Sequence, residues 1–290
     1  MNEIPTAFVL SGGGSLGAVQ VGMLAEIFAA GERPDLIVGT SAGAINGAFF
    51  AQDPSAATVE HMAQLWSRIS TREALGLSWG SLLGIAGLRG HIANPLGLRS
   101  LLARELRCQR FDQTAVPLHV LCAEQVTGMQ VVLSVGNLID AVLASSAIPG
   151  VFPPVEINGQ SLVDGMVAAE TPIATAIGLG ARTLVVLPCG FACAAKSVAR
   201  SALGRAMHAI TLLGAHQLRR DYERYSAAAT IHIVPPICPQ EQSSHDYSRG
   251  AHLIARARAS TRQWIEGGGL ARCEFPNQLM SHSHQAQATA

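Results

Sequence analysis

Charged residues are scarce in this chain, and neither sign of charge prevails. They make up only 14% of the 290 residues, with Lys+Arg and Asp+Glu both at 20, so no overall field would steer the chain toward nucleic acid. No stretch of about 18 uninterrupted apolar residues occurs, which argues against a membrane-spanning helix and leaves peripheral membrane contact open. The amino-terminal residues also lack the basic start and apolar run of a signal peptide. We therefore expect a cytoplasmic protein, with or without peripheral membrane contact, that binds no nucleic acid.

The cysteines lack the spacing of a disulfide framework or a metal site. No CxxC pair occurs among the six, which are Cys108, Cys122, Cys189, Cys193, Cys238 and Cys273. A chain of this length does not need cross-links, and scattered cysteines usually behave as small buried hydrophobic residues. The sequence therefore predicts no disulfide framework and no metal site.

Short apolar segments alternate with segments of helical periodicity along the chain. Strands are expected at 6–10, 36–39, 117–123, 129–135, 155–157, 162–163, 183–187 and 231–234, and helices at 18–29, 41–52, 57–68, 138–146, 171–179 and 197–225. This alternation predicts an α/β fold with a largely parallel sheet covered by helices on both faces. We expect one domain over residues 1–278, with a motif-bearing core at 5–190 and a disordered tail at 279–290.

Residues 74–98 differ in character from the rest. Glycine and leucine dominate the segment, with Trp79, Arg89 and His91 between them. Recurrent glycines favour flexibility over a steady helix. We interpret the segment as an apolar lid over the site, and the alternative is a core helix that tolerates its glycines.

The pentapeptide Gly39-Thr40-Ser41-Ala42-Gly43 has the GxSxG pattern of a nucleophile elbow. It follows an expected strand and opens an expected helix, which is the context that such a turn requires. The turn exposes the serine hydroxyl above the sheet, and the small flanking residues let it form without clashes. Ser41 is therefore the candidate nucleophile, with a plain strand-to-helix turn as the alternative.

A glycine-rich run from Gly12 to Gly17 joins the first expected strand to the first expected helix. Successive glycines expose backbone N–H groups beside a helix N-terminus, where they can stabilise the oxyanion of an acyl-transfer intermediate. The run also matches the G-x-G-x-x-G pattern of dinucleotide-binding proteins, which need an acidic residue at the end of the second strand. Glu32 and Asp35 come before that strand, so the nucleotide interpretation lacks its second anchor. A turn needed only for packing is the remaining alternative.

Asp164 is the candidate general base. It follows a buried apolar strand and precedes Gly165, and a carboxylate in such surroundings has its pKa raised toward working pH. The alternative is an ordinary Asp-Gly turn. None of the ten histidines stands in a position that marks it as a base. The early position of the elbow also differs from that in α/β-hydrolases.

Three blocks resemble the patatin-like phospholipases, in their bacterial form. Residues 10–24 read LSGGGSLGAVQVGML and are similar to the family's glycine-rich first block, and GTSAG is similar to its serine elbow. Residues 144–165 read ASSAIPGVFPPVEINGQSLVDG and resemble the segment that carries the catalytic Asp-Gly. The resemblance implies a three-layer α/β/α fold with a mainly parallel sheet. It also implies a Ser-Asp dyad that cleaves acyl esters of lipids without a metal or organic cofactor.

Carried over residue by residue, the family's roles fall on the candidates already named. Ser41 is the nucleophile and Asp164 its base. The oxyanion hole is formed by the N–H groups of Gly12, Gly13 and Gly14, and the supporting positions of the motifs are Gly17, Gly39, Ala42, Gly43 and Gly165.

Two residues depart from the family's usual pattern. Leu16 stands where many members have Arg or Lys, and Met166 stands where Gly or Ala is usual. These departures weaken the interpretation as a phospholipase more than the interpretation as an acyl hydrolase. The alternatives are a nucleotide-binding protein that uses the loop at 12–17 and a catalytically silent lipid-binding member of the family.

Overall fold

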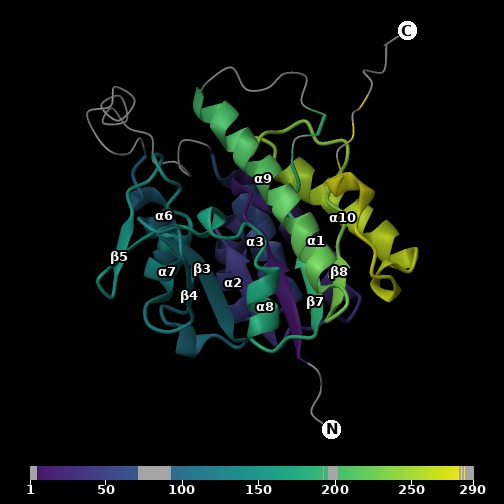
Figure 1. Ribbon diagram of the computed structural model, residues 1–290, viewed down its shortest axis with the longest axis horizontal. Helices are drawn as coiled ribbons and strands as arrows, with labels where there is room; N and C mark the ends of the chain where they lie inside the picture. Colours follow the sequence, from purple (N-terminus) through teal and green to yellow (C-terminus); the bar gives the residue numbers. More distant parts are fainter. Residues whose placement is uncertain are drawn as a thin grey trace.

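The structure, a computed structural model, describes residues 5–70, 93–191, 193–194, 202–280, 282 and 284 (Figure 1). Of the predicted lid at 74–98, residues 74–92 lie outside this part of the chain, so the lid stays a prediction. The single domain over 1–278 and the disordered tail at 279–290 also stay predictions.

The described residues form an eight-stranded sheet. The strands are β1 (Thr6–Leu10), β2 (Leu36–Thr40), β3 (Leu118–Glu124), β4 (Gln130–Leu133), β5 (Val155–Ile157), β6 (Gln160–Asp164), β7 (Thr183–Leu187) and β8 (Thr230–Ile233). Their order is β5-β6-β3-β2-β1-β7-β8, with β4 paired to β3. β3, β2, β1, β7 and β8 are parallel neighbours, whereas β4 and β6 run antiparallel to β3, and β5 runs antiparallel to β6. The mainly parallel sheet confirms the predicted fold class.

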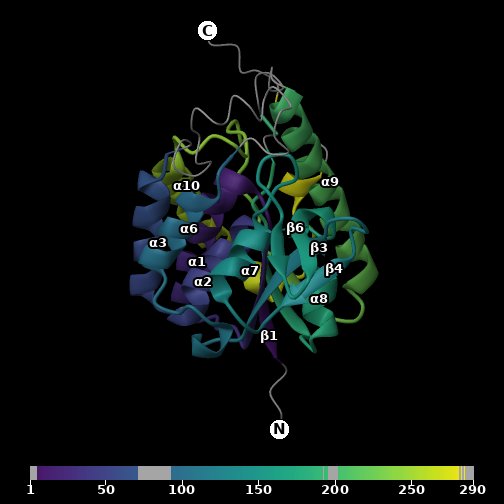
Figure 2. The same cartoon turned by 90° about the vertical axis from the view of Figure 1, so that its left-hand side faces the viewer.

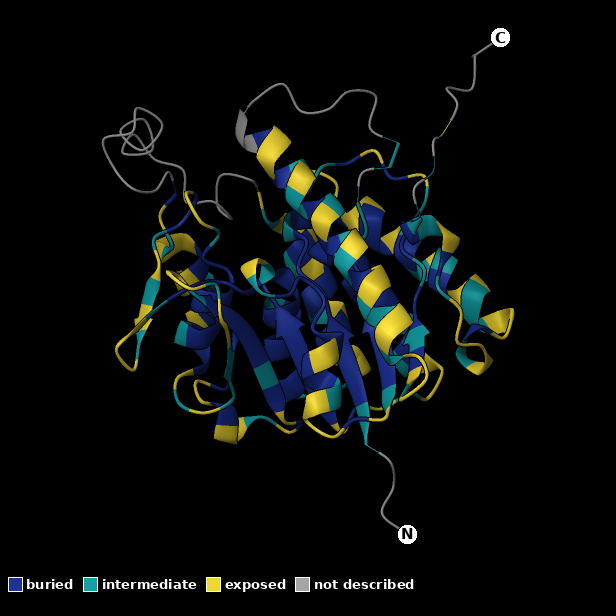
Figure 3. Cartoon of the chain, in the orientation of Figure 1, coloured by how far each residue is buried: buried dark blue, intermediate teal, exposed yellow. Residues whose placement is uncertain are grey.

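The central strands are buried on both faces because successive side chains point into two different cores. In β1, Phe8 and Leu10 belong to the larger core, whereas Ala7 and Val9 belong to the smaller one on the other face. Figure 3 shows these strands buried along almost their whole length. Burial on both faces explains why the strands are continuous apolar runs in the sequence.

Helices cover the two faces of the sheet. They are α1 (Gly17–Ala29), α2 (Ala42–Gln52), α3 (Ala56–Arg68), α6 (Leu96–Glu105), α7 (Leu138–Ser145), α8 (Ile173–Gly178), α9 (Ala202–Tyr225) and α10 (Gly250–Glu266). Short 3-10 turns are η1 (Gly14–Leu16), η2 (Phe111–Gln113), η3 (Gly165–Val167), η4 (Gly269–Ala271) and η5 (Asn277–Leu279). Figure 2 shows α1, α2 and α3 on one side of the sheet and α8 and α9 on the other. The result is the predicted three-layer α/β/α arrangement.

Two helices have no counterpart among the elements expected from the sequence. α6 begins inside the last residues of the predicted lid segment, and α10 follows β8. α10 packs closely on α1, where Gly22 leaves room for the backbone carbonyl of Ile254. Even α9, with 24 residues, lacks the long apolar stretch that crossing a membrane requires, and the same holds for the other described helices.

Candidate active site

Three segments meet at the carboxyl ends of β1 and β2. These two strands are parallel neighbours, so the glycine loop after β1 and the turn after β2 lie at the same edge of the sheet. β3 pairs with β2 up to Leu121 and with β6 from the next residue, Cys122, which is paired with Asp164. β4 pairs with both Leu121 and Cys122 and therefore occupies one edge of β3 at this point. β2 and β6 must both lie along the opposite edge of β3. The two strands therefore end head to head, which brings Asp164 to Ser41.

The turn at Ser41 has the strained backbone that a nucleophile elbow requires. Its φ of 53° and ψ of −119° lie in a region that non-glycine residues rarely occupy, at a cost of about 1–3 kcal/mol. The next turn packs against the end of β1, since a Cβ on Gly43 would meet the carbonyl of Leu10. Gly39 in turn approaches the carbonyl of Gly43 too closely for any side chain. The small residues of the motif are thus needed for the turn to form.

Ser41 and Asp164 contact each other directly. The Ser41 hydroxyl donates a hydrogen bond of 2.7 Å to Asp164 Oδ2. The other oxygen, Oδ1, accepts the N–H of Met166 at 2.9 Å. Both side chains are buried, with 4% of Ser41 and 0% of Asp164 exposed. Burial raises the pKa of Asp164 to about 7, against the smaller lowering effect of the bonds from Met166 and Ser41.

Ser145, on α7, supports the elbow and was not found from the sequence. Its Oγ accepts the backbone N–H of Ser41 at 2.8 Å and donates to the carbonyl of Leu121 at 2.6 Å. The serine therefore joins the turn to β3, the strand that also pairs with Asp164. Nothing local in the sequence separates Ser145 from its neighbour Ser146, because the contact depends on how α7 packs.

The glycine loop presents backbone N–H groups beside Ser41. Gly13 and Gly14 have φ of 155° and 56°, and side chains there would collide with Cys189 and with the carbonyl of Ser244. The N–H of Gly12 donates to the carbonyl of Glu170 at 2.8 Å. Among the described residues, the N–H groups of Gly13 and Gly14 have no acceptor. The N–H of Gly12 is thus already used within the described part of the fold, whereas those of Gly13 and Gly14 are not.

A chain of buried polar side chains fixes the glycine loop. Gln20 Nε2 donates to the carbonyls of Ser11 and Leu187 at 2.8 and 2.9 Å, which joins the loop to β7. Asn46 Nδ2 donates to Gln20 Oε1 at 2.8 Å, and Trp66 Nε1 donates to Asn46 Oδ1 at 2.8 Å. Buried amides make such bonds because leaving them unpaired is costly. The network links α1, α2 and α3 to one another and to the glycine loop.

The remaining supporting glycines allow close packing around the same point. A Cβ on Gly17 would press against the ring of Trp66 and the side chain of Ala42. A Cβ on Gly165 would meet the carbonyl of Leu121. Larger residues at either position would push apart the segments that carry Ser41 and Asp164.

Glu170 is a second buried carboxyl group near the site. Burial, reinforced by the neighbouring Asp164, raises the pKa of Glu170 well above its usual range. Its Oε2 has no hydrogen-bond partner among the described residues. Glu170 is therefore protonated more readily than an ordinary carboxyl group.

A pocket opens directly beside Ser41. Its empty volume is about 760 Å³, including its opening to solvent. Apolar side chains dominate the lining, which is formed by Gly14, Ser41, Ala42, Ile45, Phe49, Met62, Leu65, Trp66, Ile69, Leu98, Leu101, Ser146, Ile148, Phe152 and Tyr247. No lysine or arginine is among these residues, and Leu16 is packed in the core with 1% exposed. The pocket therefore suits a hydrocarbon chain better than a charged group.

The mainly parallel sheet with helices on both faces defines an α/β protein, and the strained turn at Ser41 has the backbone geometry expected of a nucleophile elbow. The family model of the patatin-like phospholipases matches residues 8–177, and the chain belongs to that family. This match confirms the resemblance drawn from the glycine run, the elbow and the Asp-Gly segment.

Relatives in sequence and structure agree with this membership. Patatin-like phospholipase domain-containing protein 7 of Mus musculus is 26% identical over 186 residues, covering 63% of this chain and 13% of the mouse protein. The uncharacterized protein YjjU of Escherichia coli K12 is 31% identical over 185 residues, covering 62% of this chain and 51% of that protein. The chain thus matches only part of the length of these relatives. VipD from Legionella pneumophila shares the fold with a TM-score of 0.53 at 12% identity, over 97% of this chain and 69% of VipD.

Proposed function

We propose that this protein is a serine acyl hydrolase that cleaves carboxylic esters of lipids with a Ser41-Asp164 dyad. The observation that carries the proposal is the 2.7 Å hydrogen bond to a fully buried Asp164 from Ser41, which lines an apolar pocket. The proposal includes a cytoplasmic location. It also includes peripheral contact with a lipid surface, because the proposed substrates are lipids. The family and the apolar lining of the pocket support this substrate class.

The proposed reaction has two steps that use the same two side chains. Asp164 takes the Ser41 proton while Oγ attacks the ester carbonyl carbon, and the N–H groups of Gly13 and Gly14 stabilise the resulting oxyanion. The intermediate collapses, the carbon–oxygen bond to the alcohol breaks, and the alcohol leaves with the proton from Asp164. Water then attacks the acyl-serine with Asp164 again as base, which releases the fatty acid and restores Ser41.

The nucleotide-binding alternative has no support in the site. Asp35 comes immediately before β2, at the end of the sheet opposite the glycine loop. Its carboxylate accepts the backbone N–H of Thr6 at 2.7 Å. A ribose-binding acid would have to lie at the carboxyl end of β2, and that position is occupied by the Ser41 turn.

We expect hydrolysis to rise with pH around neutrality. Only the ionised form of Asp164 can accept the Ser41 proton, and burial raises its pKa to about 7. The value of kcat/KM should therefore fall about ten-fold per pH unit below pH 7 and level off above about pH 8. Initial rates on a soluble short-chain ester, measured from about pH 5 to about pH 9, test this. A flat profile, or a rate that falls with rising pH in this range, would show that another group is the base.

The pocket should select for the length of the acyl chain. Leu65 of α3 lines it, and Leu65→Trp adds bulk where we place the hydrocarbon chain. We expect kcat/KM for a long-chain p-nitrophenyl ester to fall at least about ten-fold, with less than about three-fold change for the acetate ester. The matched control is Leu213→Trp, at a residue of α9 that is 65% exposed and lies outside the pocket. Equal losses on both esters in Leu65→Trp would place the acyl chain elsewhere.

A further inference from the structure

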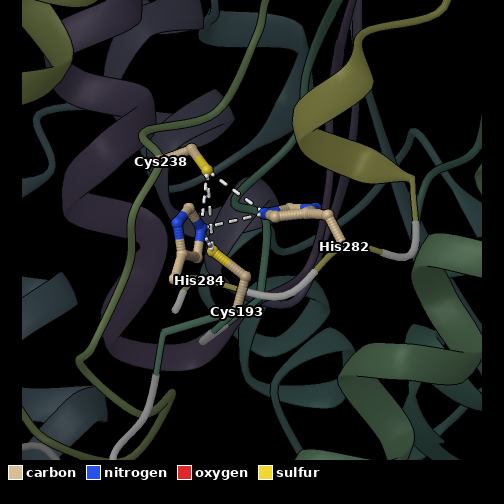
Figure 4. Close-up of side chains that lie close together, drawn as sticks. All are labelled: Cys193, Cys238, His282 and His284. Carbon is tan, nitrogen blue, oxygen red and sulfur yellow. Dashed lines mark hydrogen bonds between the residues drawn. The ribbon is translucent and has the colours of Figure 1, made fainter. Parts of the chain in front are cut away.

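Four side chains that commonly bind metals lie together beyond the carboxyl ends of β7 and β8 (Figure 4). They are Cys193, Cys238, His282 and His284, and their ligand atoms all lie within 4.8 Å of one another. Cys193 follows β7 and Cys238 follows β8, parallel neighbours whose ends meet at one edge of the sheet. The histidines follow η5. Figure 4 shows the four side chains pointing toward a common centre.

Five of the six distances between ligand atoms in this cluster lie near those of a tetrahedral ion, and the sixth, from Cys193 Sγ to His282 Nε2, is at most 4.8 Å. Zinc bonds of about 2.3 Å to sulfur and 2.0 Å to nitrogen place neighbouring ligand atoms about 3.3–3.8 Å apart. The two sulfur atoms are 3.8 Å apart, and Cys238 Sγ lies 3.2 Å from the Nε2 atom of each histidine. Cys193 Sγ lies 3.5 Å from His284 Nε2, and the two Nε2 atoms are 3.1 Å apart. A disulfide would need sulfurs about 2.05 Å apart, and both cysteines are free.

Backbone groups around the cluster orient its members. Nδ1 of His282 lies 2.7 Å from the carbonyl of Met280, which can only accept, so Nδ1 carries the proton and the Nε2 lone pair faces the cluster. The N–H of Gln240 donates to Cys193 Sγ at 3.3 Å, a contact that orients this sulfur atom. The carbonyl of Gln240 also accepts the N–H of Ala194 at 2.9 Å, which joins the two cysteine loops. Hydrogen bonds of this kind, between metal ligands and surrounding backbone groups, are typical of metal sites in proteins.

We propose that Cys193, Cys238, His282 and His284 bind one structural zinc ion. Two sulfur and two nitrogen donors in a tetrahedron are the ligands that zinc prefers, whereas magnesium and calcium require oxygen. On binding, each thiol releases one proton to solvent, and the two thiolates balance the double charge of the ion while both histidines stay neutral. Four protein ligands complete the tetrahedron, so no position is left for a reacting water.

The zinc ion would join two loops that also support the glycine loop. On the β7 loop, the N–H of Cys189 donates to Ser11 Oγ at 2.9 Å. On the β8 loop, the carbonyl of Ser244 accepts the N–H of Ser15 at 2.8 Å. Tying these loops to each other and to residues 282 and 284 should stabilise this edge of the fold. The site is distinct from the Ser41 pocket, whose lining includes none of the four ligands.

Metal content and a cobalt spectrum test the proposal without reference to hydrolysis. The full chain is purified without a histidine tag and in the presence of a phosphine reductant, dialysed, and analysed for bound metal by mass spectrometry. We expect close to one zinc per chain. Replacement of zinc by cobalt(II) should give the absorption bands of a tetrahedral ion together with thiolate charge transfer. A chelator should lower the melting temperature of the wild-type chain.

Variants identify the ligands. Cys238→Ser and the exposed His284→Ala should lower the zinc content at least about ten-fold, and Cys238→Ser should weaken the charge-transfer band. The matched controls Cys273→Ser and His252→Ala replace an exposed cysteine and an exposed histidine outside the cluster, and they should keep the wild-type zinc content. A wild-type chain without bound zinc or a thiolate–cobalt band would overturn the proposal. So would a Cys193–Cys238 disulfide, or zinc retained by both ligand variants.

Discussion

Ser41→Ala is expected to abolish ester hydrolysis, lowering kcat/KM by at least about 10⁴-fold. The substitution removes the oxygen that attacks the substrate, and the remaining N–H groups and pocket can contribute only binding and charge stabilisation. The fold should persist, because alanine is smaller than serine and the elbow is held by its close-packed glycines and by the bond from the Ser41 N–H to Ser145. Rates on p-nitrophenyl esters, with a melting curve for each protein, measure both effects.

Ser146→Ala is the matched control for this experiment. Ser146 lines the same pocket, and its hydroxyl has no hydrogen-bond partner among the described residues. Removing that oxygen should change kcat/KM by less than about three-fold. Retained activity in a correctly folded Ser41→Ala protein would mean that the nucleophile is a different residue.

Asp164→Asn should be nearly as damaging, with a loss of about 10²–10⁴-fold in kcat/KM. Asparagine can keep hydrogen bonds to Ser41 and Met166, but it cannot accept the serine proton. One oxygen of Asp164 accepts the hydrogen bond from the Ser41 hydroxyl, and the other accepts the N–H of Met166. No described histidine is hydrogen-bonded to Ser41 or to Asp164. We therefore expect no single His→Ala change among the ten histidines to cost 100-fold or more, in keeping with a dyad. One histidine variant with that loss and an intact fold would replace the dyad with a triad.

The same substitution should raise stability at alkaline pH. The pKa of Asp164 is about 7 in the folded chain and about 4 in the unfolded chain, so the folded state binds the proton more tightly. The free energy of unfolding contributed by Asp164 is thus fully present below about pH 4 and is lost as pH rises toward and through about 7. Asparagine does not ionise, so the melting temperature of Asp164→Asn relative to the wild type should increase from about pH 5 to about pH 8. The substitution also removes the Asp164 charge that helps to raise the pKa of Glu170, and this acts in the same direction. A difference that stays constant with pH would mean that Asp164 is not held in a destabilising buried state.

Local sequence patterns were sufficient to predict the part of the site formed by the glycine run and the Ser41 turn. The first strand, the glycine run, the next helix and the Ser41 turn follow one another within a short stretch of chain, and each has a sequence signal of its own. Short apolar runs that end at glycine-containing turns predicted the bounds of β1 and β2 to within one residue. These features depend on neighbours in the sequence, which is why the sequence predicts them.

Contacts between distant segments could not be predicted in the same way. Asp164 was placed at the end of a strand, but its approach to Ser41 depends on β6 pairing along the same edge of β3 as β2. Ser145 reaches the elbow only through the packing of α7. The cysteine and histidine cluster joins residues that are far apart in the chain, without the short spacings by which metal sites are usually recognised.

α10 was missed although its sequence carries a signal. Leu253, Ile254 and Ala257 are buried at helical spacing, on the face that packs against α1. The helix begins at Gly250, however, and its N-cap residue Arg249 makes no capping hydrogen bond from its side chain. Without a capping residue to mark the start of the helix, the apolar spacing alone did not suffice to predict α10.

Covalent labelling with a fluorophosphonate tests the central claim most directly, because the reagent captures an activated serine in a hydrolase site. The account predicts one adduct per chain, mapped by peptide mass spectrometry to Ser41, with labelling that is slowed by Asp164→Asn and absent in Ser41→Ala. Labelling should also quicken as pH rises through about 7, where Asp164 ionises. An unlabelled wild-type chain that instead binds NAD saturably, or an adduct on any residue other than Ser41, would contradict the account.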